Sequence, residues 1–166
     1  MSLPPVPSNE DERLASLRAL LILDSPPEER FDRITRFAAE QFDVPIVLIS
    51  LVDANRQWFK SRVGLEACET SRDVSFCAHA LHTDATMVIE NAAQDPRFHD
   101  NPLVLGEPYI RFYAGAPLIV EEGIAVGTLC LIDHQPRMLD QLDQAILGNL
   151  RDLVVEELAR TTAAST

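Results

Sequence analysis

Residues 110–133 read IRFYAGAPLIVEEGIAVGTLCLID, two apolar segments separated by a short polar turn. Both segments are rich in apolar and β-branched residues, and each is short enough to be a single strand. The turn at 121–123 (EEG) ends in a glycine, which readily takes the positive φ that a tight hairpin requires. We therefore predict an antiparallel hairpin made by strands at 110–120 and 124–132.

A second hairpin is predicted nearer the start of the chain. Residues 44–52 (VPIVLISLV) form a nearly continuous apolar run, typical of a strand that is covered on both faces. Residues 53–56 (DANR) supply turn chemistry, and residues 57–63 (QWFKSRV) alternate polar and apolar side chains as a half-exposed strand does. A further short strand is expected at 87–89 (MVI).

Helices are predicted on either side of these strands. Asn9 with Glu12, and Ser25 with Glu28, have the spacing of helix caps before two amphipathic segments that end near residues 21 and 42. A short helix is expected at 74–82, with Asp73 as its cap. The last helix, at 138–160, is expected to face the core through a stripe of apolar residues: Leu139, Leu142, Ile146, Leu150, Leu153 and Leu158.

This order of elements predicts an α+β fold, with the terminal helices on one face of an antiparallel sheet. Residues 91–109 are rich in Asp, Asn and Pro and form a long loop, with a helical turn expected at 95–98. Loops of this length inside a compact domain are usually functional. We expect this loop and the short helix to lie over the opposite face of the sheet.

The composition of the chain argues against two classes of function. The chain has 166 residues, typical of one domain, and its 14 basic and 26 acidic residues give a net charge of −12. Such a surface repels phosphate backbones and anionic lipids, so we expect neither nucleic-acid nor membrane binding. Three cysteines, an odd number, favour reduced thiols in the cytoplasm. The domain is expected at 9–160, between a flexible leader at 1–8 and a tail at 161–166.

Five blocks of the chain form a further pattern: ILDSPPEERF at 22–31, DVSFCAHA at 73–80, DPRFHDNPLV at 95–104, IRFYAGAPLI at 110–119 and GIAVGTLCLID at 123–133. In their order and spacing they resemble GAF domains, the small-molecule sensor modules of bacterial signalling proteins. The similarity is closest to the subgroup found beside histidine kinase and diguanylate cyclase output domains. It implies a sheet of five or six antiparallel strands, covered by helices on both faces, and a regulatory pocket between the sheet and the central helix and loop.

The residues that we expect to bind a small ligand combine aromatic, thiol and polar side chains. On the strand at 110–120, Arg111 and Tyr113 share one face, and Arg111 could recognise a carboxylate or phosphate. The competing interpretation is that Arg111 pairs with a carboxylate of the protein and that the aromatic residues only fill the core. The candidate site residues are Phe76, Cys77, His79, Phe98, Arg111, Tyr113, Thr128 and Cys130.

Cofactor and metal chemistry are weakly supported. Phytochrome-like GAF domains attach a bilin through a cysteine followed directly by histidine, whereas Ala78 separates Cys77 from His79 here. Cys77 and His79 are two apart on a helix and point away from each other. His79 and His82 could share an ion, but two ligands do not complete a site. We expect no cofactor.

Two other functions remain open. Free methionine sulfoxide reductases are catalytic GAF domains with cysteines near this region, so Cys68 and Cys77 allow an enzymatic interpretation. The chain lacks that family's Gly-rich block before the second cysteine, and Cys130 lies inside the last strand. A ligand-free dimerisation platform is the other alternative. The sequence favours a non-catalytic sensor that forms a homodimer through its terminal helices and relays ligand binding to an output domain.

Overall fold

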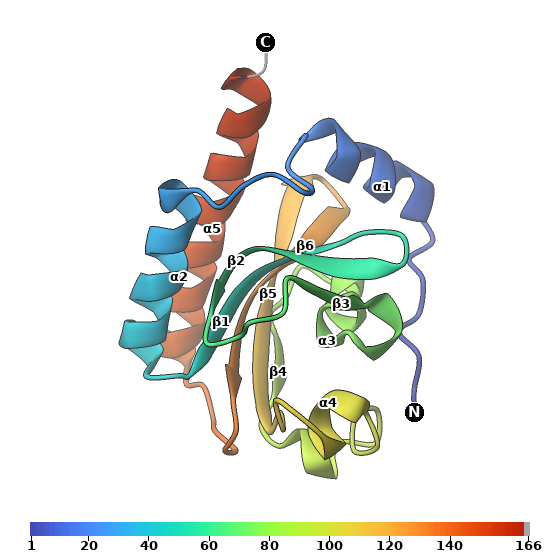
Figure 1. Ribbon diagram of the computed structural model, residues 1–166, viewed down its shortest axis with the longest axis vertical. Helices are drawn as coiled ribbons and strands as arrows, with labels where there is room; N and C mark the ends of the chain where they lie inside the picture. The colour runs from blue at the N-terminus through green and yellow to red at the C-terminus, as the bar shows by residue number, and fades with distance from the viewer. Residues whose placement is uncertain (165–166) are drawn as a thin grey trace.

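The computed structural model describes the backbone of residues 1–164 and the side chains of residues 1–160. The chain folds into one sheet with helices on both sides, and this arrangement confirms the predicted α+β fold (Figure 1). Over these residues the sheet has six strands in the order β3-β2-β1-β6-β5-β4, and every neighbouring pair is antiparallel. The strands are β1 (Ile46–Val52), β2 (Arg56–Val63), β3 (Glu69–Ser71), β4 (Met87–Ile89), β5 (Phe112–Glu121) and β6 (Ile124–Asp133).

The two predicted hairpins are β1–β2 and β5–β6, and β6 pairs with β1 to join them. Between β5 and β6, Gly123 takes a φ of +76°, as the turn requires. The helices are α1 (Glu10–Ala19), α2 (Glu29–Phe42), α3 (Phe76–His79), α4 (Pro102–Leu105) and α5 (Gln141–Ala164). Short 3₁₀ helices lie at Arg72–Val74, Ala80–His82 and Ala92–Gln94.

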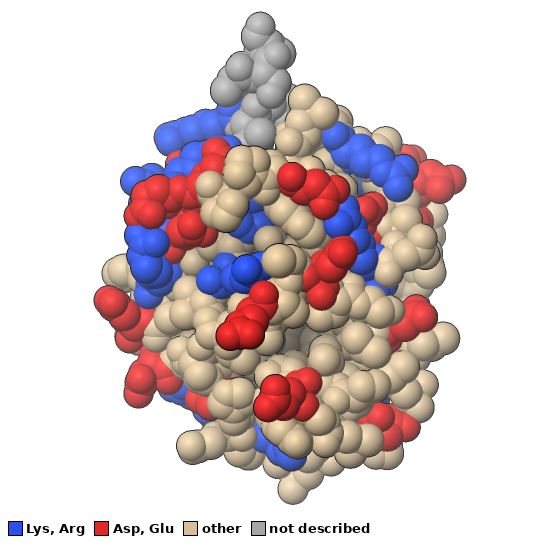
Figure 2. All heavy atoms as spheres, in the orientation of Figure 1, with Lys and Arg blue, Asp and Glu red and all other residues tan. Residues whose placement is uncertain are grey.

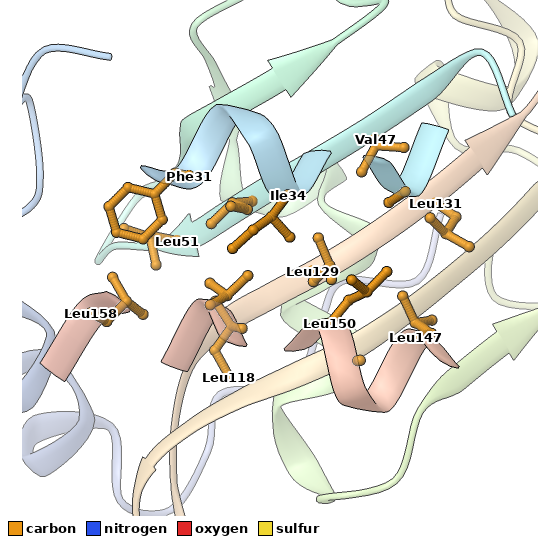
Figure 3. Close-up of a cluster of buried hydrophobic side chains, with 14 of the residues drawn as sticks. Phe31, Ile34, Val47, Leu51, Leu118, Leu129, Leu131, Leu147, Leu150 and Leu158 are labelled. Carbon is orange, nitrogen blue, oxygen red and sulfur yellow. The ribbon is translucent and has the colours of Figure 1, made fainter. Parts of the chain in front are cut away.

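The main hydrophobic core lies between the sheet and the adjacent helices α2 and α5 (Figure 3). Strand residues alternate between the two faces of the sheet, so Leu129 and Leu131 of β6 point into this core. Phe31 of α2 and Leu147 of α5 enter the same core from the helical side and are fully buried. The helix α1 lies at the end of the sheet near the β5–β6 turn, where the Asn9 side chain donates a hydrogen bond to Gly123 O at 2.8 Å.

The buried stripe of α5 differs from the predicted one. Leu142 and Leu153 were expected to face the core but are exposed, whereas Leu147 and Val154 are fully buried. The helix is apolar around much of its circumference, so several rotations satisfy a 3.6-residue period. The expected helix end at residue 160 was also wrong, because α5 continues to Ala164. The last two residues of the expected tail, 165–166, lie outside the described residues.

The predicted helix starts also need correction. Asn9 precedes α1 but makes no side-chain capping bond, because its amide is turned toward Gly123. Helix α2 begins at Glu29, and Ser25 lies before it in the connecting segment. Ser75, rather than Asp73, caps α3: its Oγ accepts a hydrogen bond from the Ala78 amide at 3.1 Å.

The second face of the sheet carries α3, α4 and the long segment between β4 and β5. The predicted strand at 87–89 is β4, and a further short strand, β3, lies between β2 and α3. Phe98 anchors the long segment: it is fully buried, and its ring stacks on Phe76 with centroids 4.1 Å apart. Residues 1–7 have no regular secondary structure, and Pro5 O lies 2.8 Å from His82 Nε2 beyond α3.

Candidate functional site

A cavity of about 600 Å³ opens between the second face of the sheet and the segments that cover it. We call it the central cavity. Its floor is apolar and comes from the central strands β1 and β6, through Ile46, Leu48 and Ile132. Its other lining residues are Gln57, Phe59, Gly64, Leu65, Glu66, Ala67, Thr70, Phe76, Cys77, Leu103, Glu107, Pro108, Tyr109, Ile110, Tyr113 and His134.

One wall of the central cavity carries a hydrogen-bonded group centred on Gln57. Its Oε1 accepts hydrogen bonds from Ser50 Oγ at 3.1 Å and from Ser75 Oγ at 2.9 Å. Its Nε2 donates to Thr70 Oγ1 at 2.6 Å. These contacts hold the Gln57 amide in one orientation, so Gln57 and Thr70 are fixed polar side chains in the lining of an apolar cavity.

At the inner end of the cavity lies a sulfur cluster formed by Cys77, Cys130, Tyr113 and Thr128. Tyr113 Oη donates a hydrogen bond to Cys77 Sγ at 3.2 Å, and Thr128 Oγ1 donates to the same sulfur at 3.0 Å. The two sulfur atoms lie 4.0 Å apart. All four residues are buried.

The cluster shifts the pKa values of its two thiols in opposite directions. Burial by itself raises the pKa of Cys77, but the hydrogen bonds to its sulfur outweigh burial and lower the pKa from 9.0 to about 6. The donors, in order of effect, are Cys130, Thr128, Tyr113 and Ser50. Burial raises the pKa of Cys130, and its contact with Cys77 raises it further. One proton therefore leaves the pair readily, from Cys77.

The structure brings most of the predicted site residues together. Phe76, Cys77 and Tyr113 line the central cavity. The other members lie directly behind this wall: Thr128 and Cys130 touch the Cys77 sulfur, and Phe98 stacks on Phe76.

His79 packs behind the wall with its ring edge against Phe98, at 4.7 Å between centroids. Burial, together with the positive charge of Arg97, lowers the pKa of His79 and favours its neutral form. Arg111 lies outside the central cavity. Its guanidinium donates to the carbonyl oxygens of Val104 and Ile110, both at 3.0 Å, and so braces the loop around α4.

The mouth of the central cavity was not predicted. It is formed by two loops, one after β2 with Leu65 and Glu66, and one after α4 with Glu107 and Tyr109. His134, just after β6, lies beside them, with its Nδ1 2.6 Å from Pro108 O. Nothing in the local sequence pattern indicates this meeting, since it depends on contacts between distant segments.

The charges at the mouth are negative. Among the described residues, those that line the central cavity include Glu66 and Glu107 but no Lys or Arg. Acidic side chains border the hollow in the middle of the face shown in Figure 2. A low-dielectric cavity of this kind disfavours anions, which would enter without a paired cation.

Within the described part of the chain, no group of three or more His, Cys, Asp or Glu side chains is arranged to hold a metal ion. None of the helices described there has both the length and the apolar character needed to cross a membrane.

Comparison with known proteins shows the family to which this chain belongs. The GAF domain model matches residues 26–164, and the chain therefore belongs to the GAF domain family. It is similar to a cyclic di-GMP phosphodiesterase of Pseudomonas aeruginosa, with 43% identity over 159 residues, which are 95% of this chain. The chain spans only 27% of that relative's length.

Solved structures of low identity share the fold. The GAF domain of a phosphoenolpyruvate-protein phosphotransferase from Coxiella burnetii matches with a TM-score of 0.70 and 17% identity, over 95% of this chain and 99% of that one. Free methionine-R-sulfoxide reductase from Neisseria meningitidis, solved with its substrate, matches with a TM-score of 0.63 and 18% identity, over 94% and 91% of the two chains.

Proposed function

We propose that this GAF domain is a non-catalytic sensor module of bacterial signal transduction in the cytoplasm. It takes a small molecule into the central cavity and relays binding through its terminal helices to an output domain. The observation that carries this proposal is the cavity itself, with an apolar floor and a few fixed polar groups such as Gln57 and Thr70. This combination is typical of small-ligand sites.

The lining favours a neutral or cationic ligand. Glu66 and Glu107 lie at the mouth, and Arg111, the one candidate anion-binding residue from the sequence, is engaged with backbone carbonyls. A phosphate or carboxylate would therefore lose its hydration without gaining a cation. By this reasoning cyclic di-GMP is not the ligand, and the similarity to a cyclic di-GMP phosphodiesterase suggests the output domain instead.

A short route connects the cavity to the terminal helices. His134 lines the cavity and begins the segment that leads from β6 to α5. Three residues later, the Arg137 guanidinium donates to Phe42 O and Asp43 O, both at 2.7 Å, and so holds the C-terminal end of α2. A ligand that displaces His134 therefore changes the position of this segment between α2 and α5, and can shift the population of two helix arrangements.

The same two helices offer a surface for homodimer formation. Leu142 and Leu153 of α5 and Phe37 of α2 are large apolar side chains exposed to solvent. Burial of these side chains against a second copy would stabilise a helical interface. Sedimentation equilibrium tests this: we expect a dimer for the native chain and a monomer for Leu153→Glu. An equal mass for both would contradict this part of the proposal.

The test of ligand binding is a thermal-shift panel of neutral, cationic and anionic metabolites. A ligand at one hundred times its Kd stabilises the domain by about 2.7 kcal/mol, a readily measured increase in Tm. Leu65→Trp, which fills the mouth of the central cavity, is the matched control and should abolish the increase. If no neutral or cationic compound raises the Tm, the sensor proposal fails and the ligand-free dimerisation platform is favoured.

The reductase remains the second candidate, because a reductase is among the proteins with this fold. The two cysteines that the sequence suggested for it are not together: Cys77 lines the central cavity, whereas Cys68 lines a separate cavity beside α2 with Lys60 and Arg62. We expect no turnover of free methionine sulfoxide with a dithiol reductant. Turnover that is lost in Cys77→Ser would contradict the sensor proposal.

A further inference from the structure

Cys77 and Cys130 face each other across the interface between α3 and β6. They are 53 residues apart in the sequence, yet their sulfur atoms lie 4.0 Å apart. Their side chains are 2% and 0% exposed. A disulfide has an S–S bond of about 2 Å, so the sulfurs need to approach by only about 2 Å to bond.

The surroundings of the pair distinguish a nucleophile from its partner. Thr128 and Tyr113 both donate hydrogen bonds to Cys77 Sγ, which stabilises the thiolate. They favour loss of the proton from Cys77, while Cys130, enclosed in the central strand β6, keeps its own. This is the arrangement of an attacking and a resolving thiol.

Small oxidants have a path to this pair. Cys77 lines the central cavity, whose volume of about 600 Å³ exceeds by far that of a hydroperoxide such as H₂O₂. Cys130 does not line the cavity, so an oxidant in the cavity reaches Cys77 first, and Cys130 lies 4.0 Å behind it. The third thiol, Cys68, is exposed and lines a separate cavity, where its sulfur accepts a hydrogen bond from Arg62 at 2.9 Å.

We propose that Cys77 and Cys130 are a hydroperoxide-oxidised dithiol site that closes to an intramolecular disulfide. The Cys77 thiolate attacks the distal oxygen, the O–O bond breaks, and the alkoxide or hydroxide takes up a proton, leaving Cys77 as a sulfenic acid. The Cys130 sulfur then attacks Cys77 Sγ. The S–O bond breaks, and the leaving hydroxide takes the Cys130 proton as water. Two electrons pass from the two thiols to the peroxide.

Disulfide formation would alter the ligand site. Strand β6 is held on both sides, by β1 and β5, whereas α3 is a single four-residue turn. The movement that joins the sulfurs therefore falls on α3, whose Phe76 lines the central cavity. Tyr113 and Thr128 also lose the thiolate to which they donate. Oxidation thus gives the domain a second input, which does not require the ligand of the proposed function.

The test uses the 166-residue chain with Cys68→Ser, which removes the exposed thiol and keeps the pair. This variant is treated with H₂O₂ in its folded state, the reaction is quenched, and the product is analysed by denaturing mass spectrometry and non-reducing peptide mapping. We expect a loss of two hydrogens per chain, a cross-link between the Cys77 and Cys130 peptides, and reversal by dithiothreitol. Thr128→Val removes one hydrogen-bond donor to Cys77 Sγ. It should raise the pH midpoint of the oxidation rate by about one unit, which corresponds to about a tenfold smaller thiolate fraction at pH values below the midpoint.

Cys130→Ser separates the two steps. Here we expect oxidation to stop at a Cys77 sulfenic acid, which dimedone captures as a stable adduct. The proposal is overturned if the folded Cys68→Ser variant forms no cross-link at H₂O₂ concentrations that oxidise Cys68 in the unsubstituted chain. It is also overturned if the cross-link forms only in denaturant. Since the ligand panel is run on reduced protein, failure here leaves the sensor proposal intact, and failure of the panel leaves this site intact.

Discussion

Replacement of Phe98 by alanine tests whether the long segment between β4 and β5 is packed onto the sheet. The Phe98 ring is fully buried, stacked on Phe76 at 4.1 Å, and met by the edge of His79 at 4.7 Å. These contacts come from α3, so the side chain fastens the segment to the wall of the central cavity. Without the ring, the segment has no comparable attachment at this point.

The expected cost follows from this burial. Truncation of a buried Phe to Ala costs about 3–5 kcal/mol, of which an aromatic pair supplies about 0.5–1.5 kcal/mol. A loop relaxes more than a core strand, so we expect about 3 kcal/mol for Phe98→Ala. For a domain of this size, that loss lowers the Tm by about 10 °C.

Urea unfolding monitored by circular dichroism measures this cost. Phe37→Ala is the matched control, since it removes the same atoms from an α2 position that is 52% exposed in the single chain; both variants are compared at a protein concentration that keeps the chain monomeric. We expect the control to cost less than about 1 kcal/mol. If Phe98→Ala costs no more than Phe37→Ala, the segment does not pack as described, and the cavity lacks one of its walls.

Three further predictions concern the frame of the domain. Gly127→Ala places a Cβ 1.9 Å from the Ser50 backbone oxygen and should cost about 3 kcal/mol or more. At Gly123 an added Cβ meets no atom within 4 Å, so Gly123→Ala should cost only about 1 kcal/mol, because of the positive φ. Chemical denaturation of the two variants measures this difference. In the monomer, Leu147→Ala should cost about 3 kcal/mol and Leu153→Ala under about 1 kcal/mol, and equal values there would contradict the helix rotation described for α5. Glu10 accepts hydrogen bonds from Arg13 and Arg72. Burial of the carboxyl raises its pKa, but the two arginines outweigh burial and lower the pKa from 4.5 to about 2. The contribution of Glu10 to folding stability is therefore complete above pH 4.5 and is lost as the pH falls toward 2. Solvent screens part of this interaction, so Glu10→Gln should cost about 2 kcal/mol at pH 7, less than the full pKa shift implies. The difference in stability from the unsubstituted chain should narrow below pH 4.5, and a constant difference would contradict the assignment.

The strands were predictable because their side-chain pattern is local. The apolar runs of β1, β5 and β6 are covered on both faces, and a short continuous apolar run of this kind is typical of such a strand. The rotation of α5 was not predictable, because Leu147 and Leu153 are equally apolar and only the packing of α2 and the sheet distinguishes them. The cap of α3 was misplaced for a similar reason: Asp73 and Ser75 both suit a cap, and the preceding 3₁₀ turn decides between them.

The candidate site was predictable where residues share one strand face or one short helix. Tyr113, Thr128 and Cys130 alternate correctly along β5 and β6 and point to the second face. Their meeting with Cys77 depends on where α3 docks, which no local pattern states. Arg111 precedes β5, so its alternation with Tyr113 along a strand did not determine where its guanidinium lies.

The relay from the central cavity to the terminal helices is tested most directly by amide chemical-shift mapping with the strongest neutral or cationic compound of the panel. We predict shifts at cavity residues such as Thr70 and Ile110 and, through His134, at Arg137 and at the end of α2 near Phe42. Leu65→Trp should remove both sets of shifts. Shifts confined to exposed charged residues, or cavity shifts without any change near Arg137 and Phe42, would contradict the account.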